Sequence, residues 1–194
     1  LFNGLSLQAT LGYAYTGGKN LNLINLEDGG DGDLFGAAVA LNANADRLVV
    51  GAPGVDDRMG AAYAFTFSDT SFSGGQLAST LTYGSVGGKN VDVANLEGID
   101  LFSGDWFGGR VALNAAGDRL AVGAPFDDGQ GNAATNSGAV YLFSFSDTNF
   151  SGATLQGIVG KGYSGGKNVD VTNLDNGDGF GLSVTLNASG DRLG

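Results

Sequence analysis

Three copies of one tetrapeptide constrain most strongly what this chain can fold into. Gly-Gly-Lys-Asn occurs at 17–20, 87–90 and 165–168. A second pattern, Leu-Asn-Xaa-Xaa-Xaa-Asp-Arg-Leu, occurs at 41–48, 113–120 and 186–193. Recurrence at a nearly fixed period indicates a tandem array of one structural unit, in which neighbouring units cover each other's apolar faces.

The recurring patterns divide the 194 residues into three repeats. Residues 1–71 form the first repeat, which opens late in a unit. Residues 72–149 form the second, and 150–194 form the third, which is truncated. We interpret the sequence as a segment of a longer repeated chain; the alternative is a domain with irregular ends.

Each repeat is predicted to hold four short strands joined by hairpins. They lie at 35–41, 47–51, 61–67 and 76–82, and again at 107–113, 119–123, 139–145 and 154–159. Aromatic residues fill every second position of 61–67 and 139–145, so their rings share one face of a sheet. A fifth short strand is expected at 20–24, 90–93 and 168–171. No segment has the caps and the 3.6-residue period of a long helix.

Two residue clusters in fixed order resemble the FG-GAP repeat. Phe35-Gly36 precedes Val50-Gly51-Ala52-Pro53, Phe107-Gly108 precedes Val122-Gly123-Ala124-Pro125, and Phe180-Gly181 opens a third copy. Such repeats form the blades of β-propellers, including the head of integrin α subunits, and recur in large bacterial surface and secreted proteins. The resemblance implies an all-β, β-propeller-like array of four-stranded antiparallel blades, incomplete within this segment. Glycine in both clusters is expected to let backbones approach closely.

Composition excludes several classes of function. The net charge of −11, from 20 acidic and 9 basic residues, argues against nucleic acid and anionic membrane surfaces as partners. The sequence has no Cys and no His, which excludes thiolate and imidazole chemistry. No apolar run approaches the roughly 20 residues of a membrane span, so we expect no membrane insertion. Residues 1–10 lack the pattern of a signal peptide.

Integrin-type blades often carry a calcium loop in the hairpin before Gly-Ala-Pro. Here that hairpin reads Asn42–Arg47 or Asn114–Arg119, which is short and holds one carboxylate beside an Arg. We predict a tight turn at this position, with its Asp accepting backbone hydrogen bonds.

The acidic loop before each Phe-Gly is the best candidate for a cation site. Its carboxylates are Glu27, Asp28, Asp31 and Asp33 in the first copy, Glu97, Asp100 and Asp105 in the second, and Asp175 and Asp178 in the third. Ca²⁺ binds 6–8 hard oxygens, and glycine lets a loop fold around it, so Ca²⁺ is the expected cofactor. The alternative is a solvated acidic loop. The pairs Asp56-Asp57 and Asp127-Asp128 are predicted to be plain surface; the alternative is that the adjacent carboxylates share a cation.

Two further features have mainly structural interpretations. Trp106, the one Trp, is expected to be buried or packed at an interface, although an exposed Trp could stack on a sugar ring. The segments 89–93 and 167–171 alternate polar and apolar residues and are predicted to be edge strands. A Lys at the start of each would discourage unwanted pairing.

The favoured function is a structural or adhesive module of a larger extracellular or cell-surface protein, with fibre formation as one form. Its partners would be further copies of the same repeat or chain. The alternative is a carbohydrate- or protein-binding propeller, similar to a lectin, with protein or glycan ligands. An enzyme is disfavoured, because the acidic residues recur copy by copy whereas an active site is usually unique.

Overall fold

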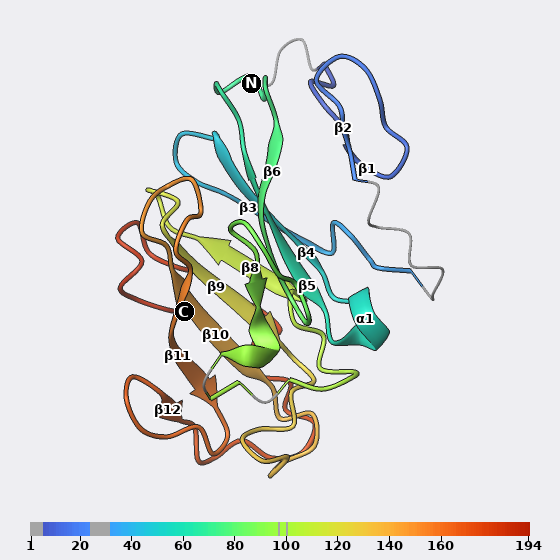
Figure 1. Ribbon diagram of the computed structural model, residues 1–194. Helices are drawn as coiled ribbons and strands as arrows, with labels where there is room; N and C mark the ends of the chain where they lie inside the picture. Colours follow the sequence, from blue (N-terminus) through green and yellow to red (C-terminus); the bar gives the residue numbers. More distant parts are fainter. Residues whose placement is uncertain (1–5, 24–31, 97, 100) are drawn as a thin grey trace.

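The computed structural model describes residues 6–23, 32–96, 98–99 and 101–194. Its strands form two five-stranded sheets and one strand pair (Figure 1). The first sheet contains β3 (Ala38–Leu41), β4 (Arg47–Ala52), β5 (Ala61–Thr66), β6 (Gln76–Thr82) and β7 (Val91–Asp92), in that order. The second contains β8 (Arg110–Leu113), β9 (Arg119–Ala124), β10 (Ala139–Ser144), β11 (Thr154–Gly160) and β12 (Val169–Asp170).

The first four strands of each sheet are antiparallel neighbours, as the four-strand prediction required. The predicted fifth strand is present at the sheet edge and runs parallel to its neighbour, β7 along β6 and β12 along β11. The pair of β1 (Leu11–Gly12) and β2 (Leu21–Asn22) is also parallel. It therefore repeats the β6–β7 arrangement ahead of the first sheet. The all-β fold and the blade architecture are confirmed.

The sheets are offset from the sequence repeats. The boundaries at 71/72 and 149/150 fall in the turns before β6 and β11. We call the sheet from Ala38 to Asp92 the first blade, and the sheet from Arg110 to Asp170 the second blade. In the third repeat, an antiparallel bridge joins Leu186 to Leu193, at the hairpin that the sequence pattern marks.

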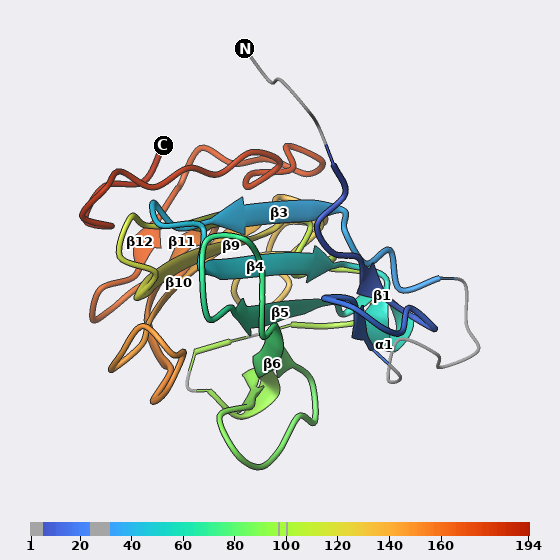
Figure 2. The same ribbon diagram turned by 90° about the horizontal axis from the view of Figure 1, so that it is seen from above.

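The two blades pack face to face. Strands β3 and β4 lie against β8, and Figure 2 shows the second blade beside the first. Val49, Ala62 and Ala64 of the first blade share one core with aromatic and aliphatic residues of the second. The alternating aromatic residues Tyr141, Phe143 and Phe145 all lie in this core, so the predicted one-sided placement of the rings is confirmed.

Helical structure is confined to two short segments of the described chain. The segment α1 (Val55–Arg58) has positive φ angles at Asp56 and Asp57, which makes it a tight turn rather than a regular helix. The 3₁₀ turn η1 (Val93–Asn95) follows β7. Neither segment, among the residues described, has the length and apolar character to cross a bilayer.

Candidate functional site

The junction between successive repeats is the most strongly built feature of the molecule. At its centre, Gly51 of the first blade faces Gly108, so that a Cβ on Gly51 would lie 1.9 Å from the Gly108 carbonyl oxygen. The next junction repeats the contact between Gly123 and Gly181, at 2.3 Å. A Cβ cannot occupy either position without moving backbone atoms. The glycines of Gly-Ala-Pro and Phe-Gly therefore meet across the junction, which confirms the expected close approach.

Hairpin tips of successive repeats are joined by main-chain hydrogen bonds. The Ala43 N–H donates to the Ala115 carbonyl (3.1 Å), and the Ala115 N–H donates to the Ala188 carbonyl (3.1 Å). The same relation therefore occurs twice along the chain, between equivalent residues of three hairpins.

An asparagine holds each of these hairpins closed. The Asn114 Oδ1 atom accepts from the N–H groups of Gly117, Asp118 and Arg119, each at 3.0 Å, and its Nδ2 donates to the Asp118 carboxylate (2.9 Å). Asn42 and Asn187 likewise accept from the N–H groups of the hairpin's Asp and Arg and donate to that Asp carboxylate in the other two copies. The predicted tight turn is present, but Asn, not Asp, accepts the backbone hydrogen bonds. The Asp carboxylate is bonded to the Asn amide.

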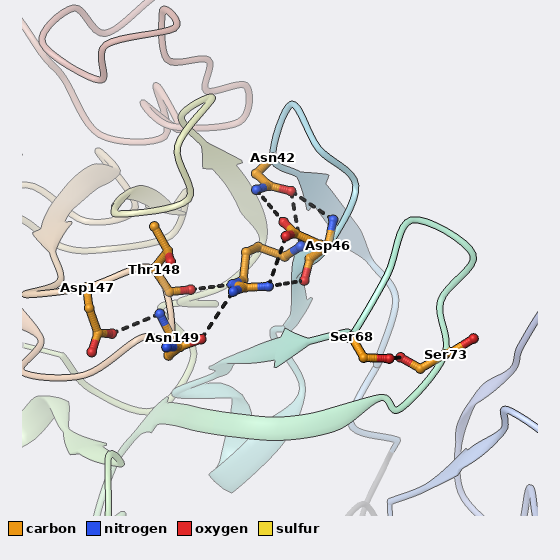
Figure 3. A network of polar contacts seen from close by, with 8 residues as sticks. Asn42, Asp46, Ser68, Ser73, Asp147, Thr148 and Asn149 are labelled. Carbon is orange, nitrogen blue, oxygen red and sulfur yellow. Dashed lines mark hydrogen bonds and ion pairs between the residues drawn. The ribbon is translucent and has the colours of Figure 1, made fainter.

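The Ser-Asp-Thr-Xaa-Phe loop at 146–150 is held by two cations of the first blade. Figure 3 shows Thr148 and Asn149 of this loop beside the hairpin that carries Asp46. The Arg47 guanidinium donates to the Thr148 carbonyl and to the Asn149 Oδ1 atom (3.1 Å). Lys89 Nζ donates to the Asn149 carbonyl (2.7 Å). The equivalent loop at 68–72 receives Lys19, whose Nζ lies 2.6 Å from the Ser71 carbonyl. The Lys of Gly-Gly-Lys-Asn thus binds the loop of the following blade at two junctions, a role that the sequence interpretation missed.

An aspartate fixes the shape of both loops. Asp69 accepts from the Ser71 hydroxyl (2.7 Å) and from the N–H groups of Ser71 and Ser73, and these bonds lower the pKa of its carboxyl to about 2. Asp147 likewise accepts from the N–H groups of Ser151 and Asn149, and the Ser151 bond is the main cause of its lowered pKa. Each loop therefore presents its carbonyl groups in a fixed conformation.

The Asn of Gly-Gly-Lys-Asn and the residue two positions later fasten the short parallel strand to its neighbour. Asn90 Oδ1 accepts from the Thr80 N–H (3.0 Å), and Asp92 Oδ1 accepts from the Gly84 N–H (2.9 Å). The same two bonds occur at β1–β2 and at β11–β12. The predicted edge strands exist, but their polar residues cap backbone N–H groups instead of only facing water.

The pair Asp127-Asp128 was predicted to lie on the surface, and Asp127 does not. Asp127 is fully buried and accepts hydrogen bonds from the hydroxyls of Tyr141 and Tyr163 and from the Gly129 N–H (2.8 Å). Burial, and then the neighbouring Asp127 charge, raise the pKa of the Tyr141 hydroxyl well above its usual value. The prediction is therefore wrong for Asp127, which belongs to the core of the second blade. In the first blade, Asp56 and Asp57 are exposed as expected.

The nine candidate calcium ligands lie in three separate loops. Glu27, Asp28, Asp31, Glu97 and Asp100 are outside the described residues. Of the others, the Asp105 carboxylate is buried and accepts from the Phe102 N–H (2.6 Å), and Asp178 accepts from the Asp175 N–H (2.8 Å). Within the described ranges, no three acidic side chains come together as a metal cage. Calcium binding stays a prediction.

Trp106 is half-buried and packs edge-on against Phe126, with ring centroids 4.9 Å apart. The ring contact agrees with the expected packing role. The main-chain N–H of Trp106 donates to the Arg58 carbonyl of the first repeat (3.0 Å). An open pocket of about 390 Å³ beside it is lined also by Leu34, Arg110 and Leu182. The equivalent positions of the three repeats, Leu34, Trp106 and Gly179, share no aromatic side chain, so this pocket does not recur as a glycan platform.

Comparison with known proteins agrees with this geometry. The family model of the FG-GAP repeat matches residues 23–65 and 91–143. The matched regions contain both complete Phe-Gly and Gly-Ala-Pro clusters and, with them, strands β3, β4, β8 and β9 of the central junction. A search of curated proteins finds no match. The recurring motifs, the blades that they build and the family match together show that this chain is an FG-GAP repeat protein.

Proposed function

We propose that this chain is a structural and adhesive repeat module of a larger extracellular or cell-surface protein, in which blades stack on one another. The observation that carries the proposal is the recurrence of one junction. The Gly–Gly approach and the hairpin-tip hydrogen bond occur between the first and second blades and again between the second blade and the third repeat. Recurrence of this kind suits assembly, because each repeat uses the same surfaces toward its neighbours.

The polar groups of the described residues support the same proposal. The motif residues Asn42, Asn90 and Asn114 are bonded to backbone, and Lys89 is bonded to the next blade. Asp127, the most buried acid, is bonded to two tyrosines. Lys89 joins two blades, and the other groups hold the shape of a single blade; these structural roles support our proposal of a non-enzymatic function.

Surface location can be tested on intact cells that produce the protein. We expect an antibody against this chain to label unpermeabilised cells or the culture medium, and brief protease treatment of intact cells to remove the labelled material. A cytoplasmic marker protein, which the protease should not reach, is the control. Labelling that needs permeabilisation and survives the protease would contradict the extracellular assignment.

Calcium is proposed as a stabilising ligand of the acidic loops before Phe-Gly. Ligand that binds only the folded state raises stability by mass action, by about 2.7 kcal/mol at a concentration 100 times the Kd. We therefore expect the Tm in millimolar Ca²⁺ to exceed the Tm in excess EDTA by several degrees, with Mg²⁺ giving a smaller shift. Equal melting temperatures in Ca²⁺ and EDTA would show that the loops are solvated acidic loops.

A further inference from the structure

An open groove of about 470 Å³ lies on the face of the second blade that points away from the first. Its walls include Arg119 of β9, Lys167 of the third Gly-Gly-Lys-Asn motif, and Leu142 and Gln156 of β10 and β11. In the sequence repeat, Arg119 corresponds to Arg47 and Lys167 to Lys89. The groove therefore carries the same two cations that bind the loop at 146–150 in the preceding junction.

The two pairs of cations differ in what they contact. The Arg47 side chain is 13% exposed and reaches across the junction to Thr148 and Asn149. The Arg119 side chain is 42% exposed, and its guanidinium contacts only Asp118, the adjacent residue, among the bonds of the described chain. Lys167 likewise turns back to Gln156 of its own sheet (2.5 Å).

Beside this groove, the junction between the second blade and the third repeat already has its hairpin contact. A Cβ at Gly117 would lie 3.1 Å from the Arg47 side chain, and a Cβ at Gly190 would lie 2.7 Å from that of Arg119. The hairpin of the third repeat thus packs on the aliphatic part of the Arg119 side chain, as the hairpin of the second repeat packs on that of Arg47. The groove continues an interface that the chain already contains.

We propose that this groove is the docking site for the Ser-Asp-Thr-Xaa-Phe loop of a further FG-GAP repeat. Arg119 and Lys167 donate to the loop's main-chain carbonyls, as Arg47 and Lys89 do at the preceding junction. The proposal rests on the proposed function as a stacking module and names the contact by which the next blade is recognised.

An intact second copy of this chain does not fit the groove in this way. The sequence contains Ser-Asp-Thr at 68–70 and 146–148 only. The loop at 68–72 is bound by Lys19, and the loop at 146–150 is bound by Arg47 and Lys89. Both loops are engaged within their own chain, so the occupant must bring a loop that is free.

The first part of the test uses the 194-residue chain itself. We expect the double substitution Arg47→Ala/Lys89→Ala to lower its Tm by roughly 3–8 °C, because hydrogen bonds from charged groups across a formed junction are lost. The matched pair Arg119→Ala/Lys167→Ala should lower the Tm by less, roughly 2 °C at most, because only the packing of the Arg119 stem against the third-repeat hairpin is lost. A comparable loss from both pairs would show that Arg119 and Lys167 act within their own blade, and would overturn the proposal.

The second part supplies the missing loop. Leu193 corresponds to Leu120, so a duplicate of residues 122–171 joined after Gly194 continues the third repeat in register. In this extended chain, Arg119→Ala/Lys167→Ala should now lower the Tm by roughly 3–8 °C. Leu142 and Gln156 replace Ala64 and Ala78 on the groove floor. If the added blade does not fold on this floor, the extended chain is made again with Leu142→Ala and Gln156→Ala in the original second blade. These two substitutions restore the alanines of the first junction.

The outcomes separate the two proposals. If the added blade folds and raises the Tm, yet Arg119→Ala/Lys167→Ala has no effect, the docking contact is wrong and stacking stands. If the added blade stays unfolded both with Leu142 and Gln156 and with the two alanines in their place, the docking proposal and the stacking function both fail. If the 194-residue chain dimerises and Arg119→Ala/Lys167→Ala abolishes the dimer, the occupant is a second copy, which overturns our choice of partner.

Discussion

Replacing Gly108 with alanine is expected to disrupt the junction between the two blades and to destabilise the chain by at least about 3 kcal/mol. A Cβ at this position would lie 2.1 Å from the Ala61 carbonyl oxygen, which belongs to the neighbouring blade and cannot rotate away. The φ angle of +85° adds strain of about 1–2 kcal/mol for a residue with a side chain. Denaturant unfolding followed by tryptophan fluorescence measures the loss.

Gly36 provides a matched control, because it is the glycine of the first Phe-Gly cluster and has a similar φ of +94°. Among the described residues, no atom lies within 4 Å of a Cβ built there. Gly36→Ala should therefore show only the backbone strain, about 1–2 kcal/mol. Similar losses for Gly36→Ala and Gly108→Ala would mean that glycine is needed for conformation alone and that the close approach is not what stabilises the junction.

Asp127→Ala is expected to destabilise the second blade by about 3–5 kcal/mol. The hydroxyls of Tyr141 and Tyr163 also bond each other (3.2 Å), so the substitution leaves one of these buried hydroxyls and the Gly129 N–H without an acceptor. Each buried polar group without a partner costs about 1–3 kcal/mol. Equilibrium unfolding in urea measures the effect, and circular dichroism verifies that the variant retains its β structure.

Asp56→Ala is the control for Asp127→Ala, because Asp56 is an exposed acid in the corresponding turn of the first blade. Its loss should change the unfolding free energy by less than about 0.5 kcal/mol. The triple variant Asp127→Ala/Tyr141→Phe/Tyr163→Phe should regain part of the stability, because the hydroxyl that lacks an acceptor is removed with the carboxylate. No recovery in the triple variant would indicate that Asp127 acts through the Gly129 loop only.

The blade architecture could be predicted from the sequence because its signals are local and repeated. Alternating aromatics at 61–67 and 139–145 and the Phe-Gly and Gly-Ala-Pro clusters located eight antiparallel strands, including β4 and β9 to within one residue. The direction of the fifth strand was not predicted. It depends on side-chain acceptors, such as Asn90 and Asp92, that bind the preceding strand across a turn.

The contacts between repeats were harder to predict, because they join residues far apart in the sequence. Arg47 and Asn149 are separated by 102 positions, and nothing near Arg47 indicates its partner. The recurrence of Lys in every Gly-Gly-Lys-Asn motif was a usable signal, since a structural role repeats with the structure. Asp127 was missed for a different reason: the position of Tyr163 in the second blade is held by Ser85 in the first blade, so comparison of the two blades gave no indication of the buried group.

The atoms that meet at the junction have a consequence for how such arrays change over time. The hairpin tips meet through the Ala43 N–H and the Ala115 carbonyl, and Lys19 and Lys89 bind the carbonyls of Ser71 and Asn149, two residues of different type. Main-chain groups survive almost any substitution of the residue that carries them. Positions that contribute only a carbonyl can therefore diverge, provided that the Asp that shapes the loop is kept, and one repeat can be copied, deleted or exchanged for another while its neighbours keep these contacts.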